Sequence, residues 1–239
     1  MSKTSLNLNP KQYQILLLIY KFRFATASLL AGYKQVSEVS MRKSLKVLVD
    51  HGYLYKRYGR IYKIDRIPAS YSLSAKARGV LKDNPEINKQ VLHARYKDKG
   101  VGQPFIDHHQ LVFKTYLDIK KQDPDRFTIF TKYELWGNTN LPDPLPDLYV
   151  TQDNKPDIMI DIYRTTTQPY LIRKRIDELI KHYEESSDQA SYPDIQIIVP
   201  TKYLEDSLNR YVEKRKDERY IDNELQLTAC RIMESKELK

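Results

Sequence analysis

One stretch of the chain, SEVSMRKSLKVLVDHGYL, has the pattern of a helix with one apolar and one basic face. Residues typical of a helix start and a helix end lie at its two ends. It begins at Ser37, a good N-cap, and Gly52 follows the last helical positions. Met41, Leu45 and Leu48 recur at the spacing of one buried helix face. The opposite side is basic. The stretch therefore predicts a helix that packs on one side and exposes a row of positive charge on the other.

Positive charge is concentrated in the N-terminal part of the chain. Residues 1–100 contain 20 Lys and Arg against 6 Asp and Glu, whereas residues 101–239 contain 20 against 25. A basic half beside a mildly acidic half indicates that one part of the chain meets a polyanion and the other part does something else. A generic basic surface is the alternative. Because the charge coincides with the helix above, nucleic acid is the favoured partner.

The basic helix is expected to be the third of three, followed by a hairpin. Asn9 is a suitable N-cap with Pro10 at the first helical position, and Thr26 can cap a short second helix that ends near Gly32. After the third helix, β-branched and tyrosine residues predict strands that turn near residues 58–60. The expected elements are helices over 10–22, 27–32 and from Ser37 onward, strands over 53–58, 61–66 and 69–73, and a helix capped by Ser74.

This order strongly resembles the winged-helix DNA-binding domains. The resemblance implies that the third helix enters the major groove and that the hairpin, or wing, reaches the backbone or minor groove. Winged helices also serve as protein-interaction modules, but the charge of this one argues against that. The residues expected to contact DNA are Ser37, Ser40, Arg42, Lys43 and Lys46 on the helix, and Lys56, Arg57, Tyr58, Arg60 and Lys63 on the wing.

The second half alternates helices and strands in an order typical of the restriction-endonuclease-like fold. Its expected helices cover 105–121, 170–185 and 202–216, and its strands 126–135, 145–151, 157–163, 194–199 and 225–232. Gly100 and Gly102 lie beside Pro104 and favour a linker at this point. The predicted fold class is therefore α+β, with a winged helix-turn-helix domain at 1–82, a linker at 83–103 and an α/β restriction-endonuclease-like domain at 104–239.

Asp147 and Asp161 lie on the second and third strands of this frame, where nucleases of the fold place two metal-binding carboxylates. Such enzymes have a lysine two residues after the second carboxylate, which positions or activates the attacking water. Here that residue is Tyr163, which has no positive charge and an ordinary pKa near 10. Lys174 and Lys181 on the following helix are candidate replacements. Two interpretations stay open, a working Mg²⁺ or Mn²⁺ site and a pair of structural carboxylates, and the second is favoured.

Together the two halves resemble the replication-relaxation family of plasmids and other mobile elements. That family pairs a winged helix with a nuclease-like domain and includes accessory factors of conjugative relaxosomes. Its recurrent features are a "DH.L" helix, a Pro-Asp before a strand, and an acidic strand followed by a Thr-rich turn and "K....Y". In this chain these features are Asp107 with His108 and Leu111, Pro146 with Asp147, Asp161 with Thr165 to Thr167, and Lys174 or Arg175 leading to Tyr183. Asp161 stands where a glutamate is usual.

The preferred interpretation is a sequence-directed, double-strand DNA-binding accessory protein of a mobile element that does not itself cut DNA. The second domain would serve dimerisation or docking of a relaxase or replication protein, and no cofactor is expected. A metal-dependent endonuclease using Mg²⁺ or Mn²⁺ and a transcriptional repressor are the alternatives. No apolar run approaches the roughly 18 residues needed to cross a bilayer, and no signal peptide is evident, so a cytoplasmic location is expected. The single cysteine, Cys230, excludes an intrachain disulfide.

Overall fold

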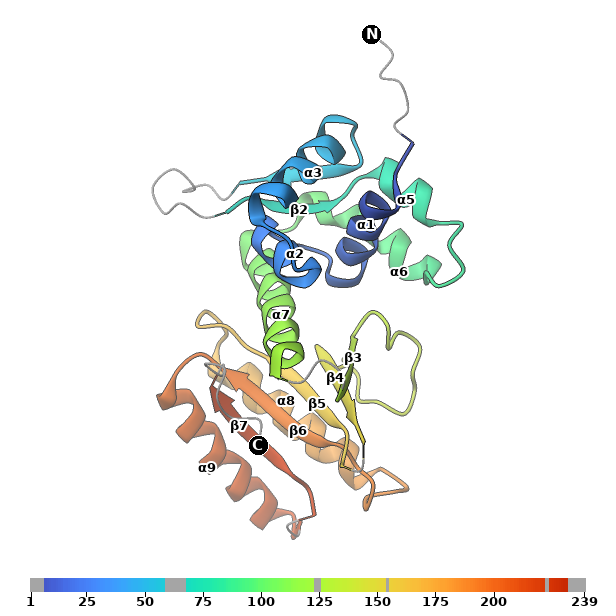
Figure 1. Cartoon of the computed structure of the whole chain (residues 1–239). Helices are drawn as coiled ribbons and strands as arrows, with labels where there is room; N and C mark the ends of the chain where they lie inside the picture. The colour runs from blue at the N-terminus through green and yellow to red at the C-terminus, as the bar shows by residue number, and fades with distance from the viewer. Residues whose placement is uncertain (1–6, 59–67, 123–125, 154, 222–223, 232–239) are drawn as a thin grey trace. The chain divides into compact units, whose positions relative to one another are not determined.

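The protein is a mixture of α-helices and β-strands (Figure 1). The computed structural model describes residues 7–58, 68–122, 126–153, 155–221 and 224–231. The chain divides into two compact units, Met1–Leu117 and Asp118–Lys239. Helix α7 (Gln103–Gln122) contributes residues to both units.

The first unit begins with three helices, each started by a side-chain cap. They are α1 (Pro10–Phe22), α2 (Ala27–Lys34) and α3 (Glu38–Asp50). Asn9 and Gln12 form a reciprocal capping box at the start of α1, which satisfies two backbone N–H groups that the helix leaves without partners. The side chains of Thr26 and Ser37 cap α2 and α3. The caps expected from the sequence are confirmed at all three helices.

A two-stranded antiparallel sheet follows the third helix. Strand β1 (Leu54–Arg57) pairs with β2 (Ser70–Leu73), so that Leu54 lies opposite Leu73 and Arg57 opposite Ser70. The sequence predicts 61–66 as the partner of the first strand, and that segment lies outside the described residues. Among the described residues, β1 pairs with the strand that was expected third, whose four residues are all buried.

The segment 83–103, expected to be a linker, folds as part of the first unit. It contains α6 (Lys89–Ala94) and the 3₁₀ helix η1 (Arg95–Gly100), which follow α5 (Ala75–Leu81). Asp98 is buried and accepts a hydrogen bond from Arg23 Nε at 2.6 Å, and Arg95 Nη2 donates to the carbonyl of Tyr20 at 2.9 Å. Each of these contacts joins residues that are 75 positions apart in the sequence. Because a buried charge without a partner is costly, the contacts hold the segment 83–103 against the first helix.

Aromatic rings fix the N-terminal part of α7 in the core of the first unit. Phe113 stacks on Phe22 with ring centroids 3.7 Å apart, and Tyr116 meets the same ring edge-on at 4.9 Å. Such pairs contribute stability beyond their buried area. The N-terminal part of α7 is therefore part of the first unit and not a free connector.

The second unit is a five-stranded mixed sheet in the order β3-β4-β5-β6-β7. The strands are β3 (Phe127–Thr131), β4 (Leu148–Gln152), β5 (Ile158–Ile162), β6 (Asp194–Val199) and β7 (Leu227–Arg231). Strand β3 pairs with β4 and β4 with β5 in antiparallel fashion, and β5 pairs with β6 and β6 with β7 in parallel fashion. Helices α8 (Pro169–Glu184) and α9 (Lys202–Glu218) make the crossovers that parallel strands require.

The core of the second unit lies between the sheet and its two crossover helices. Met159, Ile195 and Ile197 of the strands pack with Ile176 of α8 and Leu208 of α9 in one buried cluster. Because alternate strand residues face opposite sides, Met159 and Asp161 share the face that meets α8. Asp161, the second of the two carboxylates expected to bind a metal, therefore lies under α8.

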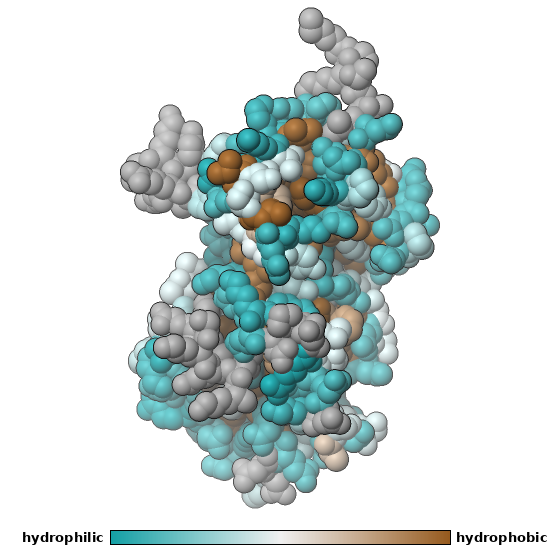
Figure 2. All heavy atoms as spheres, in the orientation of Figure 1, coloured by the Kyte–Doolittle hydropathy of each residue, from teal (hydrophilic) through white to brown (hydrophobic). Residues whose placement is uncertain are grey.

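None of the helices in the described part of the chain combines the length and the hydropathy needed to cross a bilayer. On the face shown in Figure 2, hydrophilic residues predominate, and the apolar residues form small groups among them.

Candidate functional site

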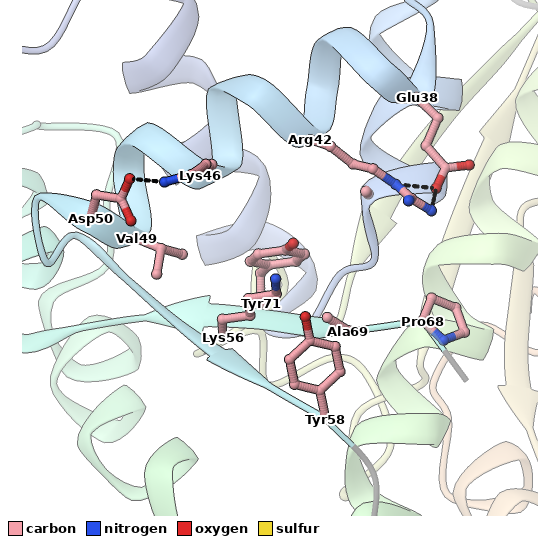
Figure 3. A pocket seen from close by; sticks show the side chains of 11 residues that line it. Glu38, Arg42, Lys46, Val49, Asp50, Lys56, Tyr58, Pro68, Ala69 and Tyr71 are labelled. Atoms are coloured by element: carbon pink, nitrogen blue, oxygen red, sulfur yellow. Dashed lines mark hydrogen bonds and ion pairs between the residues drawn. The ribbon is translucent and has the colours of Figure 1, made fainter. Parts of the chain in front are cut away.

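The first unit contains a groove of about 610 Å³ between α3 and the strand pair (Figure 3). Helix α3 forms one wall, and Lys56, Tyr58 and Tyr71 stand opposite it. The full lining is Ala27, Glu38, Arg42, Lys46, Val49, Asp50, Lys56, Tyr58, Pro68, Ala69 and Tyr71.

Charged side chains repeat every four residues along the α3 wall. Arg42 donates from Nε and Nη2 to Glu38 Oε1, at 2.9 and 2.6 Å, and Lys46 Nζ lies 2.5 Å from Asp50 Oδ2. The side chains of Arg42 and Lys46 are 65% and 75% exposed. Because exposed ion pairs within one helix are weak, both cations can exchange their carboxylate partner for another anion.

The opposite wall carries a cation held beside aromatic rings. Lys56 Nζ lies 4.8 Å from the centroid of the Tyr58 ring. Its hydrogen bond with the Tyr58 side chain raises the pKa of Lys56, so the ammonium group stays charged at neutral pH. Tyr71 is buried, and burial raises the pKa of its hydroxyl. The groove therefore presents positive charge from both of its walls.

The structure assigns different positions to the residues expected at DNA. Arg42, Lys46, Lys56 and Tyr58 line the groove, whereas Ser40 and Lys43 are exposed on α3 outside its lining. Arg57 Nη1 donates to the carbonyl of Val101 at 2.5 Å. Arg60 and Lys63 lie outside the described residues. Glu38 and Asp50 are not among the residues expected from the sequence, although each lies four residues from a cation.

Ser37 is a helix cap, and a substitution tests that role. Its side-chain oxygen accepts the backbone N–H of Ser40 at 3.2 Å. Ser37→Ala is expected to lower the free energy of unfolding by about 1 kcal/mol, because the first turn of α3 loses its cap. Ser37→Asn should retain most of the stability. Urea denaturation measures both, with Ser40→Ala as the control on the same helix, and an unchanged Ser37→Ala protein would contradict the assignment.

The second unit contains a buried pair of carboxylates, Asp147 and Asp161, each 7% exposed. Asp161 Oδ2 accepts a hydrogen bond from Arg175 Nε of α8 at 2.7 Å. Asp147 Oδ2 accepts the backbone N–H of Ile162 at 3.0 Å, and its Oδ1 lies 3.7 Å from Lys132 Nζ. Both carboxylates are therefore engaged by a cation, and Asp147 also bonds the backbone.

Burial dominates the electrostatics of this acidic site. It raises the pKa of Asp161, an effect that Arg175 opposes and that Asp147 reinforces. Tyr163 is also packed beside them, and burial together with the charge of Asp161 raises the pKa of its hydroxyl. Tyr163 is therefore neutral at physiological pH and cannot supply the positive charge of the lysine that it replaces.

Neither lysine proposed from the sequence pairs with the carboxylates. The side chains of Lys174 and Lys181 are 73% and 67% exposed, and they pair with Glu178 and Glu185 at 3.7 and 3.5 Å. The residue of α8 that reaches Asp161 is Arg175, whose Nη1 and Nη2 have no hydrogen-bond partner among the described residues. Arg175 lies among the buried residues of α8, but the sequence does not show which residue it faces.

The residues at Asp147 and Asp161 do not fit a divalent metal. A metal ion there would lie beside the guanidinium of Arg175, which already compensates the charge of Asp161. Among the described residues, no group of three or more His, Cys, Asp or Glu side chains is arranged to hold a metal. The geometry favours an internal salt bridge over metal chemistry at this position.

Comparison with known proteins gives little further information. No protein-family model and no curated protein sequence matches the chain. The similar solved structures include two mutants of Lactococcus lactis ZitR, one of them in complex with DNA. Each is 22% identical to this chain, covers 52% of it and 81% of its own length, and has a TM-score of 0.30. A TM-score this low carries no argument about fold or function.

Proposed function

We propose that the protein binds double-stranded DNA through its first unit, which acts as a winged helix. Helix α3 would lie in the major groove, and the β1–β2 pair would contact the backbone as the wing. The observation that carries the proposal is the groove, in which exposed cations of α3 face Lys56 on the strand pair. The strongly basic composition of residues 1–100 supports it.

The second unit is proposed to be a nuclease-like frame that does not cut DNA. The engagement of Asp161 by Arg175 and the neutral Tyr163 support this, and the proposal requires no Mg²⁺ or Mn²⁺. Its role would be dimerisation or docking of a relaxase or replication protein, in the cytoplasm of a cell that carries a mobile element. A metal-dependent endonuclease is the rival function, and it would require Asp161 to release Arg175 before this carboxylate could bind a metal.

The salt dependence of binding tests the DNA proposal. Each phosphate neutralised on duplex DNA contributes about −0.9 to the slope of log affinity against log salt. If Arg42, Lys43, Lys46 and Lys56 each neutralise one phosphate or its equivalent, the slope should be roughly −3 to −4. Fluorescence anisotropy with a labelled duplex between low and physiological salt measures it. An affinity that does not change with salt concentration, or no binding at low salt, would contradict the proposal.

A further inference from the structure

The basic wall of the groove also carries two carboxylates, Glu38 and Asp50, which form ion pairs with Arg42 and Lys46. Glu38 and Asp50 flank Arg42 and Lys46 on one face of α3, as Figure 3 shows. A carboxylate that faces the DNA backbone repels phosphate and weakens sequence-independent binding. Base edges differ from phosphates because they present both donors and acceptors, so reading them requires acceptors on the protein as well.

Glu38 occupies the position on α3 best suited to such reading. It lies in the first turn of the helix, and recognition helices contact bases through their N-terminal residues. Asp50 lies at the other end of the helix. Arg42 follows Glu38 by four residues, a rise of roughly 6 Å, which spans about two base-pair steps of 3.4 Å. Glu38 and Arg42 can therefore contact base pairs that lie close together along the duplex.

The geometry of the pair leaves functional atoms available on both side chains. Arg42 uses Nε and Nη2, and both donate to one oxygen, Oε1 of Glu38. Oε2 of Glu38 and Nη1 of Arg42 take no part in this interaction. The side chain of Glu38 is 40% exposed, and Arg42 engages only one of its two oxygens. In the structure the pair places the guanidinium of Arg42 beside Glu38 in the lining of the groove.

We propose that Glu38 is a specificity-determining residue, which makes α3 prefer duplexes with cytosine at one position of the binding site. Its carboxylate accepts a hydrogen bond from the N4 amino group of cytosine, and Arg42 donates to O6 and N7 of a guanine nearby. The inference rests on the proposed function, since it names the class of DNA that the same surface takes. It also gives Glu38 a role at the N-terminal end of the basic face of α3.

Selection from a pool of random duplexes tests this inference with the full chain. The wild-type protein is expected to enrich a motif with an invariant cytosine. Glu38→Gln should lose this preference by about tenfold or more, and the preference at that position should move toward adenine, which glutamine binds through N6 and N7. Asp50→Asn removes one charge from the same face and is the matched control. It should change overall affinity but keep the motif.

The outcomes separate the inference from the function on which it rests. A motif that is identical in wild type and Glu38→Gln would overturn the role of Glu38 while leaving DNA binding intact. Enrichment of a motif without cytosine would do the same. If no duplex is retained by the wild-type protein at low salt, the proposed function itself fails.

Discussion

Replacing Arg42 and Lys43 together by alanine is expected to weaken binding to duplex DNA by roughly 10- to 100-fold. Removal of an arginine that contacts bases costs about 1–3 kcal/mol, and loss of a phosphate contact by the lysine adds to it. The variant also leaves Glu38 without its cation, so an uncompensated carboxylate faces the DNA. Titration of a labelled duplex at fixed salt measures the change.

A second double variant controls for the loss of two positive charges. Lys82 and Lys89 are exposed in the same unit and do not line the groove. Lys82→Ala with Lys89→Ala changes the net charge by the same amount, so a general electrostatic effect would weaken both double variants equally. We expect the control to bind within about threefold of wild type. If the two double variants lose affinity equally, the assignment of α3 as the recognition helix is wrong.

Arg175→Met is expected to lower the free energy of unfolding of the second unit by about 3–5 kcal/mol. The side chains of Arg175 and Asp161 are 6% and 10% exposed, and they are joined by a 2.7 Å hydrogen bond. Methionine has an unbranched apolar side chain that is shorter than that of arginine and has no charge. Asp161 then lies beside Asp147 without its partner, whether it is ionised or protonated. A buried charge without compensation is strongly destabilising. Urea denaturation followed by circular dichroism measures the effect.

The neighbouring residue supplies the control for this substitution. Lys174→Met changes the same helix by the same charge at a side chain that is 73% exposed, and it should alter stability by no more than about 0.5 kcal/mol. Asp161→Leu combined with Arg175→Met removes both members of the pair, so most of the lost stability should return. If Arg175→Met behaves like Lys174→Met, the buried pair is not a structural element.

Local signals were sufficient to place most helices and strands. Helix caps are decided by residues within one turn, so Thr26, Ser37 and Ser74 give helix starts that agree with the structure. The strand at 194–199 is likewise marked by a short apolar run, and its bounds are those of β6. In the first unit the helical face of Arg42 and Lys46 also follows from periodicity alone.

Features that depend on distant partners were not visible in the sequence. The glycine-rich segment before α7 is typical of a linker, but Asp98 bonds Arg23, 75 residues away, and fixes that segment in the first unit. The ion pair of Arg175 with Asp161 depends on how α8 packs against β5, and a list of lysines on α8 could not reveal it. Long-range pairing of buried charges is specified by tertiary packing, so single-sequence patterns miss it.

The most direct test of the central claim is to measure DNA binding and DNA cleavage in the same reaction. Supercoiled and linear DNA would be incubated with the purified protein in Mg²⁺ or Mn²⁺, with Asp161→Asn as the parallel variant. We expect a mobility shift with intact DNA for both proteins, because the first unit binds and the acidic site of the second unit holds Arg175 in place of a metal. Metal-dependent cutting by the wild type that disappears in Asp161→Asn would contradict the account and make the protein a nuclease.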